Sequence, residues 1–213
     1  TLYNNLANTA NLAGNDQQAL ELYLQALEVF RATKNQDMII MCQTNMGAAR
    51  VGLGEFQLAE NDFRQVLALT ENSGWLGLSL TCHFLAEACL GQGKLEEARG
   101  AALQALAYAR ETGARQALGA AWRSLGKVAS RVKAEIEVDG KFHSAQEYFQ
   151  NSDRVFSDQE ADGERAHTLK AWAEYELDAG DKKKGKKLWE QARDIFGRLE
   201  MTAELEKMKK DSS

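Results

Sequence analysis

The stretch LAEACLGQGKLEEA, residues 85–98, decides the fold because the chain repeats its pattern from end to end. Residues 46–59, MGAARVGLGEFQLA, form the second clearest copy. Each copy has a large apolar residue beside a small one, then six variable residues, a glycine, and a small residue five positions later. The small residues that end the five copies are Ala19, Ala59, Ala98, Ala145 and Gly185. They follow one another at steps of 40, 39, 47 and 40 residues, and a period near 40 is typical of stacked helix-pair solenoids.

The third copy shows the helix pair within one repeat. Apolar or small residues spaced by three and four run through residues 78–89 and predict one face of an α-helix. Gly91 and Gly93 then supply the permissive backbone of a tight turn, and a second apolar stripe follows over residues 95–109. Two antiparallel helices cannot bury both stripes alone, so the next pair must cover them.

Small residues mark where the two helices of a pair should cross most closely. On the first helices these are Gly47, Ala86, Gly126 and Ala173, and the small residues that end each copy are their counterparts on the second helices. A large side chain at either position would force the axes apart from their usual spacing of about 8–10 Å.

Composition excludes several classes of protein. The 213 residues contain no proline, which fits an almost wholly helical chain, and their net charge of −5 argues against general nucleic-acid binding. Three cysteines do not suggest a disulfide framework and fit a reducing, cytoplasmic location. No apolar run approaches the roughly 18 residues of a membrane span. Because the chain begins at Thr1 without Met, we expect a fragment of something longer.

The repeats resemble the tetratricopeptide repeat, whose pattern is W-x₂-L-G-x₂-Y, then A-x₃-F, then P. Residues 122–126, WRSLG, match the opening. The A-x₃-aromatic part recurs, with one glycine in place of alanine, at Ala19/Tyr23, Ala59/Phe63, Ala145/Phe149 and Gly185/Trp189. The terminal proline is missing and the period is near 40 rather than 34, as in the longer variant of bacterial regulators and kinesin-light-chain-type adaptors.

This resemblance implies an all-α protein, an α-α superhelix (TPR solenoid) of five helix-pair repeats with a C-terminal capping helix, in a single domain over residues 1–213. The repeats are expected at about residues 1–33, 38–72, 77–112, 116–157 and 163–198, with the capping helix at about residues 199–210. Met201, Leu205 and Met208 form the apolar stripe of that cap.

The fourth repeat carries an insertion, because Gly126 to Gly140 spans 14 residues where the other repeats have seven. Seven extra residues are close to two helical turns, so we favour a helix that continues in phase through residues 133–139. The alternative is a turn with β character around residues 136–142, because Asp-Gly is a hairpin signal.

In the family, the first helix of each pair lines the concave face. The residues that this implies for partner binding are Asn5, Asn8, Thr44, Asn45, His83, Arg123, Lys127, Arg131 and Lys170. The asparagine carboxamides could grip a peptide backbone, since each offers donors and an acceptor; the alternative is a plain solvated helix face.

Arg123, Lys127 and Arg131 are spaced four apart and form a basic stripe that, with Lys170, could receive an acidic segment or a carboxylate. The alternative is ordinary surface charge, or pairing within the chain with Glu87 and Glu174. If a partner binds this stripe, charge reversal at Lys127 is expected to weaken that binding without lowering the melting temperature.

No pattern predicts catalysis, a cofactor or a metal ion. Cys82 and Cys89 share the core face of one helix, His83 points to another side, and no second Cys/His cluster completes a zinc set. We therefore expect a non-catalytic module that binds a protein or peptide partner in its groove, as a regulatory or sensor part of a larger bacterial protein. The alternatives are a small-ligand-sensing or autoinhibitory arm of a signalling enzyme or transcription regulator, and a scaffold that self-associates through its end repeats.

Overall fold

The chain forms a curved stack of helix pairs. The computed structural model describes residues 2–70 and 75–211. The helices of this part are α1 (Leu2–Leu12), α2 (Asp16–Ala32), α3 (Gln36–Gly52), α4 (Phe56–Thr70), α5 (Leu78–Gly91), α6 (Leu95–Thr112), α7 (Arg115–Val132), α8 (Ala145–Ser157), α9 (Asp162–Ala179), α10 (Lys182–Arg198) and α11 (Thr202–Asp211). Two short strands, β1 (Ile136–Val138) and β2 (Lys141–His143), separate α7 from α8. The predicted superhelix of five helix pairs and a cap is confirmed; the expected repeat ends at residues 1 and 72 lie outside the described residues.

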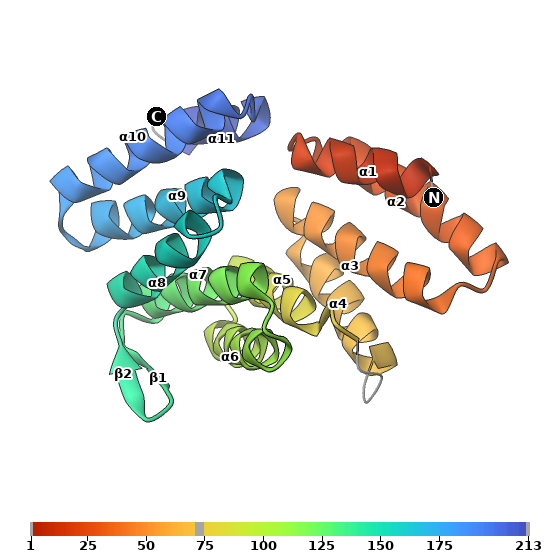
Figure 1. Cartoon of the computed structure of the whole chain (residues 1–213), viewed down its shortest axis with the longest axis horizontal. Coiled ribbons are helices and arrows are strands. Elements are labelled where there is room, and N and C mark those ends of the chain that lie inside the picture. The colour runs from red at the N-terminus through yellow and green to blue at the C-terminus, as the bar shows by residue number, and fades with distance from the viewer. Residues whose placement is uncertain (1, 71–74, 212–213) are drawn as a thin grey trace.

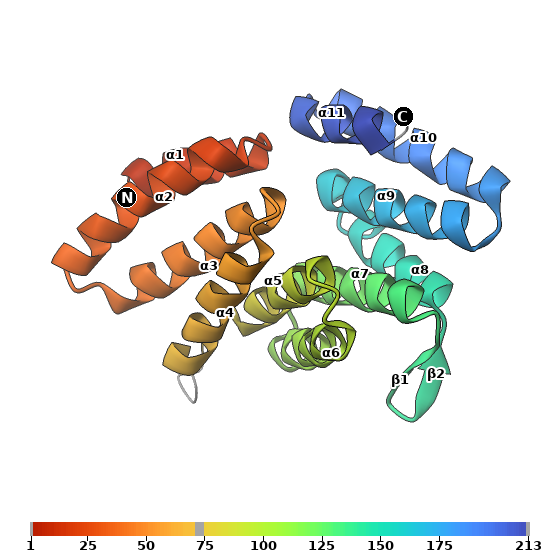
Figure 2. The same ribbon diagram turned by 180° about the vertical axis from the view of Figure 1, so that it is seen from behind.

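The pairs follow an arc whose first and last helices come together. Figures 1 and 2 show the arc running from α1 through α5 and α7 to α10 and α11, which brings the first helix pair near the capping helix. Consecutive first helices contact one another, α1 with α3, α3 with α5, α5 with α7 and α7 with α9. These helices therefore form a continuous inner layer, and the second helices pack on its outside.

The turns and crossings of the pairs follow the repeated residues. Gly54 and Gly93 adopt φ angles of +78° and +74°, a backbone conformation that an L side chain rarely takes. At the crossings, a Cβ added to Gly47 would lie 2.5 Å from the Phe63 ring, and one added to Gly126 would lie 2.8 Å from the Phe149 ring. The small residues are needed there because the partner helix places an aromatic ring against the backbone.

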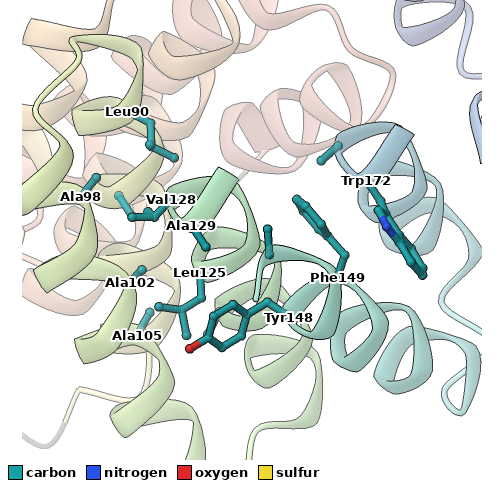
Figure 3. Close-up of a cluster of buried hydrophobic side chains, with 14 of the residues drawn as sticks. Leu90, Ala98, Ala102, Ala105, Leu125, Val128, Ala129, Tyr148, Phe149 and Trp172 are labelled. Carbon is teal, nitrogen blue, oxygen red and sulfur yellow. The ribbon is translucent and has the colours of Figure 1, made fainter. Parts of the chain in front are cut away.

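The buried apolar residues form two clusters rather than one. The smaller cluster lies in α1, α2 and α3, and it includes Tyr23, Phe30 and Met46. The larger cluster begins at α4 and continues to α11; Figure 3 shows the part in which Leu125, Tyr148 and Trp172 lie. The boundary therefore falls within the second repeat, between α3 and α4.

The insertion is a β-hairpin, so the prediction of a longer helix is wrong. Helix α7 ends at Val132, and Lys133 takes a left-handed conformation. Strands β1 and β2 pair antiparallel, with Val138 opposite Lys141 across a turn in which both Asp139 and Gly140 have positive φ. This is the backbone that an Asp-Gly turn favours. The alternation of Ile136, Glu137 and Val138 buries the two β-branched residues, whereas a continued helix would have carried them along a stripe with no neighbouring repeat to cover it.

The hairpin is fixed to the fourth repeat through Tyr148 of α8. The Tyr148 hydroxyl donates a hydrogen bond of 2.7 Å to the backbone carbonyl of Ile136, and its side chain is fully buried. Arg110 of α6 forms an ion pair of 2.7 Å with Asp139 at the hairpin tip. The outer side of the hairpin stays exposed, with 63% of Phe142 accessible.

The capping helix α11 closes the last repeat as expected. Met201, Leu205 and Met208 pack on the larger cluster, and Met208 is almost completely buried. No helix of the described residues is both long enough and apolar enough to cross a membrane.

Candidate functional site: the concave face

The candidate groove residues from the first two repeats form a short ladder of amides. Asn8 of α1 accepts hydrogen bonds from the Tyr23 hydroxyl at 2.6 Å and from the Asn45 amide nitrogen at 3.3 Å. Among the described residues, the Asn8 amide nitrogen and the Asn45 amide oxygen form no hydrogen bond with the chain. Asn5 is exposed beside them. These amides keep a donor and an acceptor free for a peptide backbone.

Three other candidates are buried and cannot touch a partner directly. Thr44 donates its hydroxyl to the Ile40 carbonyl and is 4% exposed. His83 is 3% exposed, and its Nδ1 lies 2.7 Å from the Ser124 hydroxyl oxygen. Arg123 is 9% exposed and donates to the Glu164 carboxylate at 2.8 Å, with its guanidinium over the Phe156 ring. Thr44 bonds within its own helix α3, whereas His83 and Arg123 join neighbouring first helices beneath the concave face.

The His83–Ser124 contact looks like part of a nucleophile–base pair but lacks what such chemistry needs. Burial, with help from the positive charge of Arg123, lowers the pKa of His83 to about 4. The Ser124 hydroxyl is fully buried, so no substrate reaches it. A histidine with so low a pKa is also a weak base, so it would remove a proton from the hydroxyl poorly near neutral pH. The contact is a structural hydrogen bond between α5 and α7.

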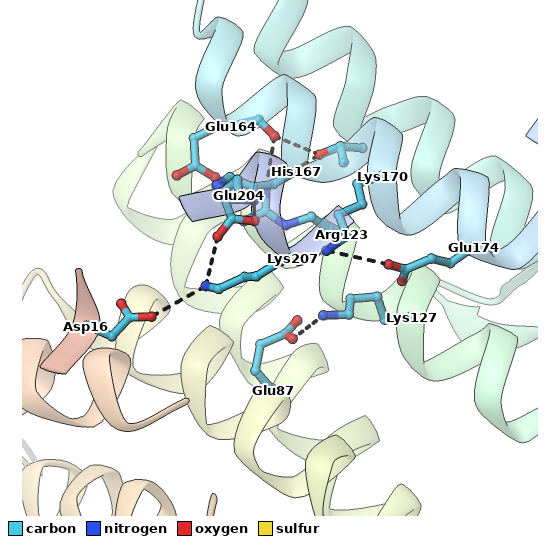
Figure 4. Close-up of polar contacts among 11 residues, drawn as sticks. Asp16, Glu87, Arg123, Lys127, Glu164, His167, Lys170, Glu174, Glu204 and Lys207 are labelled. Atoms are coloured by element: carbon cyan, nitrogen blue, oxygen red, sulfur yellow. Dashed lines mark hydrogen bonds and ion pairs between the residues drawn. The ribbon is translucent and has the colours of Figure 1, made fainter. Parts of the chain in front are cut away.

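Acidic residues of the same or a neighbouring repeat neutralise most of the basic stripe (Figure 4). Lys127 of α7 forms an ion pair with Glu87 of α5, and Lys170 of α9 lies 4.0 Å from Glu174. These are the internal pairs that the sequence left open as an alternative. Burial raises the pKa of Glu87, but Lys127 and other cations outweigh it, so the pKa falls below its ordinary value. Reversal of the Lys127 charge would place a second carboxylate beside Glu87. We therefore expect this variant to have a lower melting temperature as well as weaker partner binding.

Arg131 differs from the other cations of the stripe. It is exposed at the end of α7, and no carboxylate within residues 2–70 and 75–211 forms an ion pair with it. It lines a cavity of about 380 Å³ on the concave face, together with groups from the C-terminal halves of α5 and α9. Residues that the sequence did not single out complete this cavity: Phe56, Leu90, Ser130, Ala171, Tyr175 and Asp178. Leu90, Ser130, Tyr175 and Asp178 lie one or five residues after the small crossing residue of their helix, or next to such a position, so repeat phase could have found them. Phe56 and Ala171 do not follow this spacing.

A second cluster has the ligand types of a metal site but the wrong neighbours. Glu60, Cys89 and Glu97 bring one potential ligand atom each within 4.8 Å of one another. Arg64 already contacts both carboxylates, at 2.8 Å and 2.5 Å, and Lys94 lies 2.7 Å from Glu60. Burial raises the pKa of the Cys89 thiol to about 11, so it stays protonated at neutral pH. Protein cations therefore occupy the place a metal would take. Cys82 is fully buried in the core, as expected.

Comparisons with known proteins agree with this architecture. Residues 1–72 match the family model described as tetratricopeptide repeat. No curated protein matches the sequence closely enough to count as a relative.

Several solved structures share the fold at low sequence identity. A structure of a Rap protein complexed with Competence and Sporulation Factor superposes with a TM-score of 0.79 at 13% identity, over 93% of this chain and 54% of that one. The apo form of RapI superposes with a TM-score of 0.75 at 15% identity, over 91% of this chain and 66% of that one. TPR-like repeats of a putative kinesin light chain from Podosopora anserina superpose with a TM-score of 0.59 at 19% identity, over 93% of this chain and 94% of that one.

The chain thus spans 54% and 66% of the two Rap structures and most of the kinesin-light-chain repeats. The periodic glycines, the small crossing residues and the continuous inner layer of first helices extend the matched repeats to the C-terminal cap. Residues 1–72 thus match the tetratricopeptide repeat family, and the whole chain shares the fold of TPR-like helical solenoids.

Proposed function

We propose that this chain is a non-catalytic module that binds an extended segment of a partner protein, or a peptide, along its concave face. The observation that carries the proposal is the cavity between α5, α7 and α9, because three successive repeats contribute both apolar and charged groups to it. A groove with convergent polar groups and an apolar lining is the usual form of a recognition site.

The groups of the cavity suggest how a segment would be held. Leu90 and Tyr175 offer apolar surface, and Arg131 offers a guanidinium that can take a carboxylate in a two-pronged hydrogen bond. Asp178 supplies the opposite charge within the same cavity. Near the other end of the inner layer, Asn8 and Asn45 can bond a peptide backbone. A segment that pairs an acidic and an apolar residue at the cavity fits this arrangement best.

The test is selection of peptides from a random display library by the wild-type chain. We expect the selected peptides to lose affinity at least about tenfold for Arg131→Glu, which corresponds to about 1.4 kcal/mol. The matched control is Lys186→Glu, the same change in charge on the outward helix α10, and it should bind as wild type does. Both variants should keep the wild-type melting temperature. Equal affinity of Arg131→Glu and wild type for every selected peptide would contradict the site.

A second role follows from the Rap comparison. Because that structure holds a factor and is longer than this chain, we propose that this chain also acts as the sensing or restraining arm of a larger bacterial regulator. A regulator needs an output domain, so the complete reading frame should encode one next to the repeats. A reading frame with repeats alone would favour a freestanding adaptor or scaffold instead.

A further inference from the structure

The two ends of the superhelix touch each other. Gly14, in the turn between α1 and α2, lies against Ala203 of α11, and a Cβ added to Gly14 would stand 2.5 Å from the Ala203 Cβ. Next to this contact, the Lys207 ammonium lies 3.4 Å from the Asp16 carboxylate and 2.9 Å from the Glu204 carboxylate. Asp16 and Lys207 are 191 residues apart in sequence. The arc is therefore closed into a ring, and Figure 4 shows Lys207 between its two acidic neighbours.

The contact differs in kind from the packing between successive repeats. Helix α11 is anchored to the C-terminal repeats by its apolar side, through Leu205 and Met208. In the described part of the chain, α11 meets the first repeat through the Asp16–Lys207 ion pair and the contact between Gly14 and Ala203. No residue of the smaller apolar cluster in α1 to α3 belongs to the cluster that includes α11. Closure thus rests on groups that can separate without exposing a core.

The charges at the junction are well matched but only partly shielded from water. Burial raises the pKa of Asp16 despite the opposing effect of Lys207. Burial lowers the pKa of Lys207, but Glu204 and Asp16 outweigh it and raise the pKa overall. At neutral pH the ammonium therefore stays charged, while 40% of the Lys207 side chain remains exposed. An ion pair of this kind is weak and sensitive to salt.

We propose that Asp16, Lys207 and the Gly14–Ala203 contact form a latch, which holds the first repeat against the capping helix and opens to widen the concave groove. Helices α1 to α3 can move together because they share one apolar cluster, which is separate from the larger cluster that begins at α4. The latch also reaches the inner helix α9, because Glu204 lies 3.9 Å from His167, one turn before Lys170. The effect of the latch on partner binding rests on the proposed function, whereas the opening of the latch does not.

The experiment measures the ring directly, without any partner. Spin labels on Gln25→Cys in α2 and Glu190→Cys in α10 report the distance across the junction by pulsed EPR; the native cysteines are buried. In Lys207→Glu, three carboxylates meet, and we expect the distance distribution to shift to longer values. The double variant Asp16→Lys with Lys207→Glu should restore the short distance. High salt should lengthen the distance in the wild type.

Two controls separate opening from unfolding. Lys186→Glu carries the same charge change away from the junction and should leave the distance unchanged. Lys207→Met keeps the length of the side chain without its charge, so it tests the latch even if Lys207→Glu lowers the helical content by circular dichroism. An unchanged distance in both Lys207 variants, or an equal shift in the control, would overturn the latch. Because no partner is added, that result would leave groove binding standing, and failure of the Arg131 test would leave the latch standing.

Discussion

At the residue scale, Glu60 shows how the solenoid keeps a buried carboxylate ionised. It is 4% exposed in α4 and accepts hydrogen bonds from Arg64 of its own helix and from Gln92 and Lys94 of the next repeat's turn, at 2.7–2.8 Å. Burial raises the pKa of Glu60, but these three donors outweigh it and lower the pKa to about 2. One side chain thus joins the second repeat to the third.

Replacement of this residue should change how stability depends on pH. The folded-state pKa lies below the ordinary value, so the stabilisation is present above about pH 4.5 and is lost as the pH falls towards 2. We expect Glu60→Gln to cost about 1–2 kcal/mol at pH 7, less than the full pKa shift would give because Arg64 and Lys94 are partly exposed. Urea unfolding at pH 7, 4 and 3 should show the deficit shrinking with acid. Glu96→Gln, at an exposed position in α6, is the control, and a pH-independent deficit would contradict the argument.

Two glycines in helix interiors should respond in opposite directions to alanine. A Cβ at Gly126 would lie 2.8 Å from the fully buried Phe149 ring, so Gly126→Ala should destabilise the fold by about 1–2 kcal/mol. Gly100 is exposed in α6 and has nothing within 4 Å, so Gly100→Ala should stabilise it by about 0.5–1 kcal/mol. Thermal unfolding of the two variants measures both effects. Destabilisation by Gly100→Ala would show that helix propensity is not what limits that site.

At the element scale, the hairpin depends on one buried hydroxyl. Tyr148→Phe removes a buried hydrogen bond to the Ile136 carbonyl, and because Ile136 also pairs with His143 across the hairpin it should cost about 0.5–1.5 kcal/mol. The variant should favour local opening of the hairpin more than unfolding of the whole chain, because β1 and β2 pack against the helices on one side only. We expect faster tryptic cleavage within residues 133–141 than in wild type. Cleavage at the wild-type rate would mean that the turn and the Arg110–Asp139 pair suffice to hold the hairpin.

The elements show what the sequence could and could not predict. The helix pairs were predictable because each turn glycine and each small crossing residue obeys a local rule of backbone or packing. The length of the insertion could not predict the hairpin, because seven residues match two helical turns equally well; the Asp139–Gly140 turn is the signal that the structure follows. Ile136 and Val138 add to that turn signal, because β-branched residues on alternate positions favour a strand.

At the scale of the whole molecule, the two apolar clusters should differ in stability. The smaller cluster lies at one end of the array, and α1 leaves Leu2, Tyr3 and Leu6 largely exposed. Repeat arrays lose structure from their ends when the end repeats are less well covered. We expect the amides of α1 and α2 to exchange hydrogen at lower denaturant concentration than those of α7 and α8, by hydrogen-exchange mass spectrometry. A single cooperative exchange of all helices would argue that the two clusters unfold as one.

Repeat phase predicts which side chains face the concave side, but not how their charges are paired. It predicts that Asn8, Asn45 and Arg131 face that side, and Arg131 lines the cavity between α5, α7 and α9. The same phase also selected His83 and Arg123, which are buried, because the inner layer is thick enough for neighbouring first helices to cover each other. Ion pairs between repeats, such as Lys127 with Glu87, depend on which repeats are neighbours and on side-chain reach. A basic stripe in sequence therefore became a nearly neutral surface in space.

The hairpin of the fourth repeat has a practical consequence for work on this molecule. It leaves the helix stack between two regular helices and returns to it, so its tip at Asp139 and Gly140 can change length without altering the spacing of the repeats. Exposed turns of this kind are where folds best accept foreign sequence. A fluorescent reporter or an affinity epitope inserted between Asp139 and Gly140 would mark the molecule on its outer side and leave the concave face and both chain ends unmodified.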